Sequence, residues 1–261
     1  DTLLADLNGD GSLDAVTTNE LDGDASVFLS NGDGTFAAGV RLPTGAMPQA
    51  VASGDIDGDG DDDLVVANEL DGTVSVLIGA GDGTFVLATA LPVGDAPFDV
   101  LLEDVDDDGA LDVISADSGS DQLSLMLGAG DGSFAVATSL AVGVTPRGLD
   151  SGDLNGDGFL DLVTANEGSD DLSLLLNNAD GTFAPASSMV LSPFTQEPQS
   201  VLVIDENGDG NLDLASTNEL SNDVTIRYGY GDGRFDLAIR VLVGTAPQHL
   251  VAIDVDGDGQ L

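Results

Sequence analysis

The stretch DLNGDGSLD at residues 6–14 decides the fold, because close copies of it return along the whole chain. The copies are DIDGDGDDD at 55–63, DVDDDGALD at 104–112, DLNGDGFLD at 153–161 and DENGDGNLD at 205–213, and a partial sixth, DVDGDGQL, starts at Asp254. Their start-to-start spacings are 49, 49, 49, 52 and 49 residues. This regularity predicts a repeat protein that carries acidic, oxygen-rich loops on a repeated scaffold.

The second repeat shows what lies between two such loops. LVVAN follows the loop, and then come the turn Leu70–Gly72, the run TVSVLIG, the turn GDGTF and the run VLATALPVG. Short runs rich in Val, Leu and Thr, broken by Asp-Gly and Gly-Asp-Gly turns, indicate strands and hairpins, and no stretch has helix periodicity. The pattern of each unit therefore predicts four antiparallel strands, with the acidic loop joining the first strand to the second.

A four-stranded unit of about 40–50 residues is typical of a β-propeller blade. The expected third strands, such as Val76–Ile78 and Leu125–Leu127, are apolar on both faces, as in sheets stacked on either side. A β-sandwich would alternate apolar and polar residues there. We expect an all-β propeller domain over residues 1–261, with units at about 1–49, 50–98, 99–147, 148–199, 200–248 and a partial 249–261. The partial unit favours part of a six- or seven-bladed ring.

The chain resembles the FG-GAP and VCBS-type repeats of the integrin α-subunit propeller and of bacterial secreted proteins. The resemblance rests on the acidic loops together with GDGTF at 32–36 and 81–85, GDGSF at 130–134, ADGTF at 179–183 and GDGRF at 231–235. It implies a propeller of usually seven blades, calcium in the loops, and a role in adhesion or ligand binding.

The spacing within the loops indicates calcium independently of that resemblance. Calcium takes six to eight hard oxygen ligands in flexible geometry. Side chains at positions 1, 3, 5 and 9 and the backbone carbonyl at position 7 can supply them, and glycine at position 6 allows the tight curve. The predicted ligands are Asp6, Asn8, Asp10, Ser12 and Asp14; Asp55, Asp57, Asp59, Asp61 and Asp63; Asp104, Asp106, Asp108, Ala110 and Asp112; Asp153, Asn155, Asp157, Phe159 and Asp161; and Asp205, Asn207, Asp209, Asn211 and Asp213. About five calcium ions are expected.

The loops also allow other interpretations. Each could be an ordinary Asp/Asn-Gly turn, but five in register disfavour that. The glutamate that an EF-hand carries at position 12 is missing. Asp107 replaces a glycine in the third loop and Asp62 an apolar residue in the second, which makes their geometry less certain. The sixth loop, with Asp254, Asp256 and Asp258, ends before position 9, so weak or absent binding is expected there.

Composition limits the partners. The 261 residues hold 48 Asp and Glu against five Arg and no Lys, with a net charge of −43. Nucleic acids and anionic membranes are therefore poor partners, whereas divalent cations are natural ones. Cysteine is absent, and no apolar run is long enough to span a bilayer. Salt adaptation would also produce such acidity. Calcium loops favour an extracellular or cell-surface location, where calcium is millimolar.

The fifth unit departs most from the pattern. Arg227 stands where the other units have Phe or an aliphatic residue, and Tyr228, Tyr230 and Arg234 lie close by in sequence. They could form a patch for a ligand, although adjusted packing is the simpler interpretation. The Asp of each GDG turn and the recurring Asn-Glu pairs, such as Asn68-Glu69, are expected to serve turns.

The leading hypothesis is a calcium-stabilised extracellular propeller that binds a protein or glycan ligand in adhesion. The alternative is a purely structural, calcium-rigidified module of a larger surface protein or filament. A polysaccharide-acting enzyme is a third hypothesis, but nearly every acidic residue has a repeated position, and one His with no Cys or Lys offers little for catalysis. We therefore predict that the protein is not an enzyme. The oligomeric state is left open.

Overall fold

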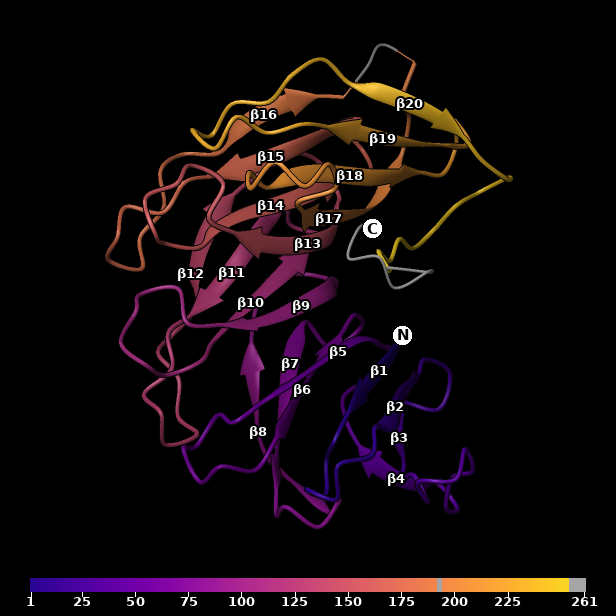
Figure 1. Cartoon of the computed structure of the whole chain (residues 1–261). Coiled ribbons are helices and arrows are strands. Elements are labelled where there is room, and N and C mark those ends of the chain that lie inside the picture. The colour runs from indigo at the N-terminus through magenta and orange to yellow at the C-terminus, as the bar shows by residue number, and fades with distance from the viewer. Residues whose placement is uncertain (192–193, 254–261) are drawn as a thin grey trace. The chain divides into compact units, whose positions relative to one another are not determined.

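The computed structural model describes residues 1–191 and 194–253, and these residues contain strands and no helix. No helix in this part of the chain could therefore cross a membrane. The strands form five four-stranded antiparallel sheets, in each of which the strands lie in chain order (Figure 1). We call these sheets blades 1 to 5.

The strands of the five blades are as follows. Blade 1 consists of β1 (Thr2–Ala5), β2 (Asp14–Asn19), β3 (Asp24–Phe28) and β4 (Val40–Pro43), and blade 2 of β5 (Pro48–Gly54), β6 (Asp63–Asn68), β7 (Thr73–Gly79) and β8 (Phe85–Pro92). Blade 3 consists of β9 (Pro97–Glu103), β10 (Asp112–Asp117), β11 (Gln122–Met126) and β12 (Thr138–Ala141). Blade 4 consists of β13 (Pro146–Gly152), β14 (Asp161–Asn166), β15 (Asp171–Leu175) and β16 (Ser187–Val190), and blade 5 of β17 (Pro198–Ile204), β18 (Asp213–Asn218), β19 (Asp223–Arg227) and β20 (Ile239–Leu242).

The blades group into two compact units, which are described separately. The first contains Asp1–Asp104 and Asp108–Ser139, and the second Val105–Asp107 and Leu140–Leu261. Within the first unit β5 contacts both β1 and β9, and within the second β13 contacts β17. The first strands of neighbouring blades thus face one another, as the inner strands of a propeller do.

Burial follows the strand order within a blade. All residues of β6, β10, β14 and β18 are buried, whereas β8, β12, β16 and β20 are mostly exposed. The third strands β7, β11 and β15 are largely buried too, with Val76, Leu77 and Met126 at most 1% exposed, whereas β3 and β19 are about half buried. This confirms the prediction of two buried faces in blades 2 to 4, a pattern that stacked blades produce.

An apolar core fills the space between stacked blades. In the first unit Val65 and Val76 of blade 2 pack in one cluster with Val113 and Met126 of blade 3. In the second unit Val163 and Leu174 of blade 4 share a cluster with Val201 and Leu214 of blade 5. Apolar residues on both faces of the second and third strands therefore supply the contacts between blades.

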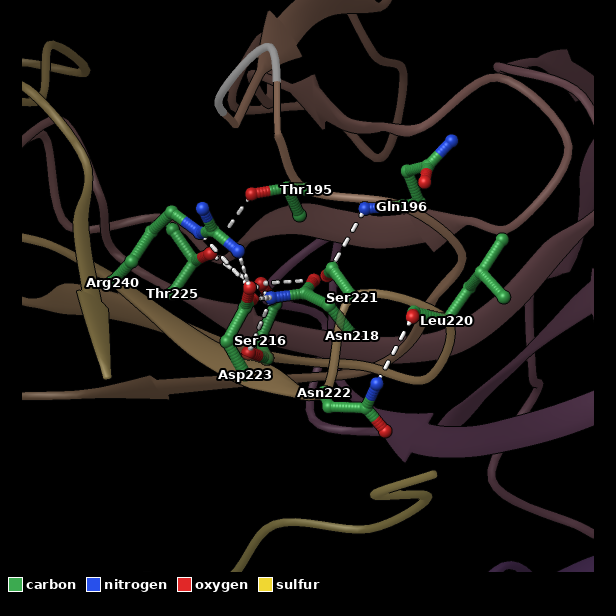
Figure 2. A network of polar contacts seen from close by, with 10 residues as sticks. All are labelled: Thr195, Gln196, Ser216, Asn218, Leu220, Ser221, Asn222, Asp223, Thr225 and Arg240. Atoms are coloured by element: carbon green, nitrogen blue, oxygen red, sulfur yellow. Dashed lines mark hydrogen bonds and ion pairs between the residues drawn. The ribbon is translucent and has the colours of Figure 1, made fainter. Parts of the chain in front are cut away.

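A polar cluster ends each second strand, at the end opposite the acidic loop, and it is buried in blades 2 to 5. In blade 5 Asn218 Nδ2 donates to Asp223 Oδ1 at 2.6 Å and to Thr225 Oγ1 at 2.9 Å (Figure 2). The guanidinium of Arg240 pairs with Asp223 and lies 5.9 Å from the ring centroid of Phe194. Phe194 and Thr195 belong to the segment between β16 and β17, where the fourth repeat holds the extra residues that give the 52-residue spacing. Phe194 is 70% exposed, and Thr195 is buried. Ser192 and Pro193 of this segment lie outside the described residues.

Blade 3 uses a carboxylate in place of this asparagine. Asp117 is fully buried, and its Oδ2 accepts hydrogen bonds from Ser124 Oγ at 2.5 Å and Gly94 N at 3.0 Å. Burial raises the pKa of Asp117, against the effect of the hydroxyl and amide donors that favour the ionised form. Asn68 accepts from Gly45 N and donates to Ser75 Oγ, so an amide satisfies the same environment in blade 2.

We expect Asp117→Asn to raise the free energy of unfolding at pH 7.5 by about 1 kcal/mol, because an amide can bond to the same partners without the cost of burying a charge. Because the folded-state pKa of Asp117 is raised, the folded wild type binds more protons than the unfolded chain, and it loses stability as the pH rises through that pKa. The asparagine of the variant does not titrate, so its stability does not fall with pH for this reason. Urea unfolding in chelator at pH 4.5 and 7.5 checks the expectation, and an identical pH dependence of both proteins would contradict it.

Candidate metal centres

Each acidic loop connects the first strand of a blade to the second, as the sequence predicts. The residue at position 2 anchors the loop, since Leu7, Ile56, Val105 and Leu154 are at most 2% exposed. The fifth loop has Glu206 at that place. This anchoring was not predicted, although the apolar residue between two acidic ones was a visible signal.

The carboxylate at position 1 organises the loop around itself. Asp153 Oδ1 accepts from Gly156 N at 2.7 Å and Asp157 N at 3.1 Å, and its Oδ2 accepts from Gly158 N at 2.9 Å. The position-1 residues Asp6, Asp55, Asp104 and Asp205 likewise accept the N–H of position 6, at 2.8–3.0 Å. The backbone therefore curves around this carboxylate.

Positions 3 and 5 tighten the curve. In every loop the position-5 carboxylate accepts the N–H of position 7 at 2.8–3.0 Å. Asn8, Asp57, Asn155 and Asn207 at position 3 accept the N–H of position 5 at 2.9–3.2 Å. The position-6 glycines have φ between 85° and 92°, a conformation that disfavours any side chain.

Two loops bring three carboxylates together. One ligand oxygen each of Asp55, Asp57 and Asp59 lie within 4.8 Å of one another, and so do those of Asp104, Asp106 and Asp108. Either triad could hold a metal ion. In the other three loops position 3 is an amide, from Asn8, Asn155 or Asn207, so two carboxylates and one amide oxygen stand there. A donor set made only of oxygen suits calcium rather than zinc.

The aspartate at position 9 has a second role that the sequence did not reveal. It begins the second strand and is fully buried in all five blades, as Asp14, Asp63, Asp112, Asp161 and Asp213. Asp161 Oδ2 accepts from Leu154 N at 3.1 Å, and its Oδ1 accepts from Asn177 N, just after β15, at 2.8 Å. The carboxylate thus ties the loop to the third strand of its own blade. An oxygen with two lone pairs can still bind a cation.

Burial at position 9 disfavours the charged carboxylate. It raises the pKa of Asp161 to about 6, with a smaller contribution from the charges of Asp157 and Asp153, while the two backbone amides act in the opposite direction. Burial also raises the pKa values of Asp63 and Asp213. A nearby cation would reverse this shift by favouring the ionised form.

The departures predicted from sequence have defined geometries. Asp107 has a φ of 58°, in the same left-handed region as the equivalent Gly58 and Gly156, so it keeps the loop path. Aspartate tolerates this region better than most residues. Burial raises the pKa of Asp62, and the charges of Asp55 and Asp6 add to the effect. Asp254, Asp256 and Asp258 of the sixth loop lie outside the described residues.

Position 7 faces the GDG turn of its own blade. A Cβ added to Gly81 would lie 2.3 Å from Asp61 Oδ2, and one added to Gly231 would lie 2.3 Å from Asn211 Oδ1. Ser12 and Ala110 lie 3.3 and 3.5 Å from the corresponding sites on Gly32 and Gly130. The use of the position-7 carbonyls as ligands, including that of Phe159, stays a prediction.

Other repeated acidic residues have partners within their own blade. Asp82 Oδ1 accepts both the N–H of Thr84 at 3.0 Å and its hydroxyl at 2.5 Å, and Asp33, Asp131 and Asp180 repeat these bonds. Glu69 accepts from Gln49 Nε2 at 2.6 Å, and Glu167 pairs with Arg147 at 2.5 Å. The bonds of these aspartates fit the turn roles expected from sequence, whereas Glu69 and Glu167 contact the first strands of their own blades.

The predicted ligand patch in blade 5 contains one residue bound to backbone carbonyls and others with exposed surface. Arg227 donates to the carbonyls of Asp236 at 2.9 Å and Leu191 at 3.2 Å, and it also contacts that of Val190. It therefore links β19 to the end of β16. Tyr230 is 61% exposed, and the exposed Arg234 pairs with Asp232. Tyr228 is partly exposed. Arg227 is thus engaged with backbone carbonyls, whereas Tyr228, Tyr230 and Arg234 keep exposed surface.

The first unit also contains a cavity of about 300 Å³ that the sequence did not predict. It lies beyond the end of β6, opposite the acidic loop of blade 2. The lining combines acidic and apolar residues from separate turns: Met47, Glu69, Leu70, Asp71, Gly72, Asp95 and Ala96.

Comparison with known proteins agrees with the repeat structure. A family model described as FG-GAP-like repeat matches residues 6–66, 55–109, 104–164, 153–216 and 205–261. No curated protein sequence matches the chain.

Several solved structures share the fold. An Agrocybe aegerita lectin, solved for its recognition of non-reducing terminal N-acetylglucosamine, has a TM-score of 0.62 and 21% identity over 92% of this chain and 65% of its own. A putative 6-phosphogluconolactonase from Bacteroides fragilis has a TM-score of 0.64 and 15% identity. The match covers 94% of this chain and 68% of the Bacteroides protein. The V. cholerae biofilm matrix protein Bap1 has a TM-score of 0.57 and 18% identity. The match covers 95% of this chain and 40% of Bap1.

The chain thus spans about two thirds or less of these proteins, and identities this low concern the fold alone. Together with the five four-stranded sheets, the matches confirm the predicted all-β propeller.

Proposed function

The chain belongs to the FG-GAP-like repeat family, and from this premise we propose that it is a calcium-binding propeller module that presents a surface for adhesion or ligand binding. The observation that carries the proposal is the shared curvature of the five acidic loops. In each of them the carboxylates at positions 1 and 5 accept backbone N–H groups within the loop.

Calcium fits this donor set better than magnesium does. The loops offer carboxylate, amide and carbonyl oxygens on a curved backbone, whereas magnesium requires near-ideal octahedral geometry and retains several waters. One ion in each complete loop gives about five per chain. Asp55, Asp57 and Asp59 would hold the ion in the second loop, with Asp63 and the carbonyl of Asp61 completing its shell.

The ions have a structural role in this proposal. Without a cation, three carboxylates with oxygens inside 4.8 Å repel one another and oppose the loop curvature. A bound calcium removes that repulsion and stabilises the folded chain by mass action. The loops then hold each blade in shape while other surfaces contact the partner.

The expected partner is a protein or a glycan outside the cell. A lectin and a biofilm matrix protein share the fold, which makes such partners reasonable candidates. Nucleic acid is a poor candidate, because the net charge is −43 and Arg41, Arg147, Arg234 and Arg240 each pair with a carboxylate. We propose no enzymatic activity. A purely structural module in a larger surface protein or filament is the second candidate.

The proposal is tested on an array of glycans and matrix proteins, probed in calcium and then in chelator. Binding is expected in calcium and is expected to fall at least tenfold in chelator. Tyr230→Ala should weaken binding without changing the melting temperature, because Tyr230 is 61% exposed. Val136→Ser, at a 91% exposed apolar position of blade 3, is the control and should leave binding unchanged. Absence of binding in both buffers would favour the structural module instead.

A further inference from the structure

The GDG turn of one blade lies against the acidic loop of the preceding blade. In the first unit Gly132 N, in the turn of blade 3, donates to Ile56 O in the loop of blade 2 at 3.3 Å. In the second unit Gly233 N, in the turn of blade 5, donates to Leu154 O in the loop of blade 4 at 2.9 Å. Ile56 and Leu154 both occupy position 2, so the two units repeat the same contact.

The third loop is held at the same position by a different donor. Asn177 Nδ2 of blade 4 donates to Val105 O at 2.7 Å. Asn177 is buried and precedes the ADG turn of that blade. A donor from the following blade therefore reaches position 2 in three of the five loops.

The turns lie in close contact with the loops, and most closely at the fourth loop. A Cβ on Gly58, at position 4 of the second loop, would lie 3.2 Å from Gly130 O, and one on Gly156 in the fourth loop would lie 2.9 Å from Gly231 O. On the turn side, a Cβ on Gly233 would lie 3.6 Å from the Cβ of Asn155. The turn thus supports the backbone that carries the position-3 ligand.

The position-2 side chains attach the loops to the following blade as well. Ile56 is in one apolar cluster with Val100, Val113 and Met126 of blade 3. Leu154 is in a cluster with Val201 and Leu214 of blade 5. Each of these loops therefore contacts the next blade through a carbonyl, a glycine and a buried side chain, all next to the ligands at positions 1, 3 and 5.

We propose that calcium in the second and fourth loops fastens one blade to the next, with Gly132 and Gly233 as positioning residues in the following blade. This inference rests on the proposed calcium binding. An ion bound by the side chains at positions 1, 3 and 5 also fixes the backbone at positions 2 and 4 between them. The carbonyl at position 2 and the glycine at position 4 are the parts of the loop that contact the turn of the following blade. Thermodynamic linkage then requires the docked turn to raise calcium affinity by the same factor by which calcium strengthens docking.

Amide hydrogen exchange at Gly233 and Gly132 tests the proposal, since each amide makes the hydrogen bond to the loop. Calcium is expected to slow exchange at both amides by at least tenfold relative to chelator. Gly156→Ala places a methyl group against Gly231 O and should abolish the calcium effect at Gly233 while leaving it at Gly132.

Gly208→Ala is the matched control. Gly208 occupies position 4 of the fifth loop with a φ of 74°, close to the 76° of Gly156, but an added Cβ meets nothing within 4 Å. It shares the backbone strain without the contact, so it should leave the calcium effect at Gly233 intact. An equal loss in both variants would overturn the proposal.

If Gly156→Ala does not fold, calorimetry and amide exchange on the wild type alone still test the proposal. Calorimetric calcium binding with unchanged exchange at Gly233 and Gly132 would overturn the fastening role and leave the proposed function standing. No calcium binding in the calorimeter would overturn the proposed function itself.

Discussion

Replacing Asp161 by Ala is expected to lower the free energy of unfolding by about 3 kcal/mol, in chelator as well as in calcium. Asp161 is fully buried and accepts hydrogen bonds from Leu154 N and Asn177 N through its two oxygens. Alanine leaves both amides without this acceptor, and each unsatisfied buried donor costs about 1–3 kcal/mol. Burial raises the pKa of Asp161 to about 6, so keeping its charge in the folded protein costs free energy. Alanine removes that cost, which offsets part of the loss.

Asp157→Ala in the same loop is the matched comparison. Asp157 is exposed, and its Oδ1 accepts from Phe159 N at 3.0 Å, an interaction that water can replace. In chelator this variant should differ from the wild type by less than about 1 kcal/mol. In calcium it should lose the contribution of the fourth site. Urea unfolding of both variants in both buffers separates the two roles, and equal losses in chelator would show that position 9 has no separate structural function.

Removing calcium is expected to lower the melting temperature by at least about 10 °C. A site filled at a hundred times its dissociation constant stabilises the folded state by about 2.7 kcal/mol. In a chain of this size each kcal/mol shifts the melting temperature by about 2–4 °C. The two aspartate triads alone would reach the expected value. Calorimetric or fluorescence melts in calcium and in chelator measure it.

Screening must be separated from binding in that experiment, because the chain carries a net charge of −43 and any salt reduces its self-repulsion. The chelator buffer is therefore matched in ionic strength with sodium chloride, and magnesium replaces calcium in a third sample. Magnesium should recover less of the stability than calcium does. A melting temperature that follows ionic strength alone, whichever cation is present, would contradict the role of the loops.

Much of the fold could be predicted because each repeat carries its own local signals. The loop from Asp55 to Asp63 and the turn at Gly81–Phe85 fix the limits of strands whose residues are apolar on both faces. Both the four-stranded sheets and the buried third strands follow from such short-range patterns. The curvature of the loops also depends on neighbours only two to five residues apart, as in the bonds from Gly158 and Asp157 to Asp153.

Contacts between distant residues could not be predicted from one sequence. Gly132 and Ile56 are separated by more than a repeat, and no local pattern shows that they meet. The second role of Asp161 depends on an amide 16 residues away. Arg227 was singled out by its unusual position, but its use in contacting backbone carbonyls became visible only in the fold. The cavity beside Met47 and Ala96 is lined by three separate segments of the chain and gives no sequence signal.

A calcium titration by isothermal calorimetry, on protein first stripped with chelator, tests the central claim most directly. The five complete loops predict about five calcium ions per chain at millimolar calcium. Asp57→Ala, which removes one carboxylate from the triad in the second loop, should lower that count by about one. Heats no larger than those of calcium dilution, with the chain folded, would contradict the account.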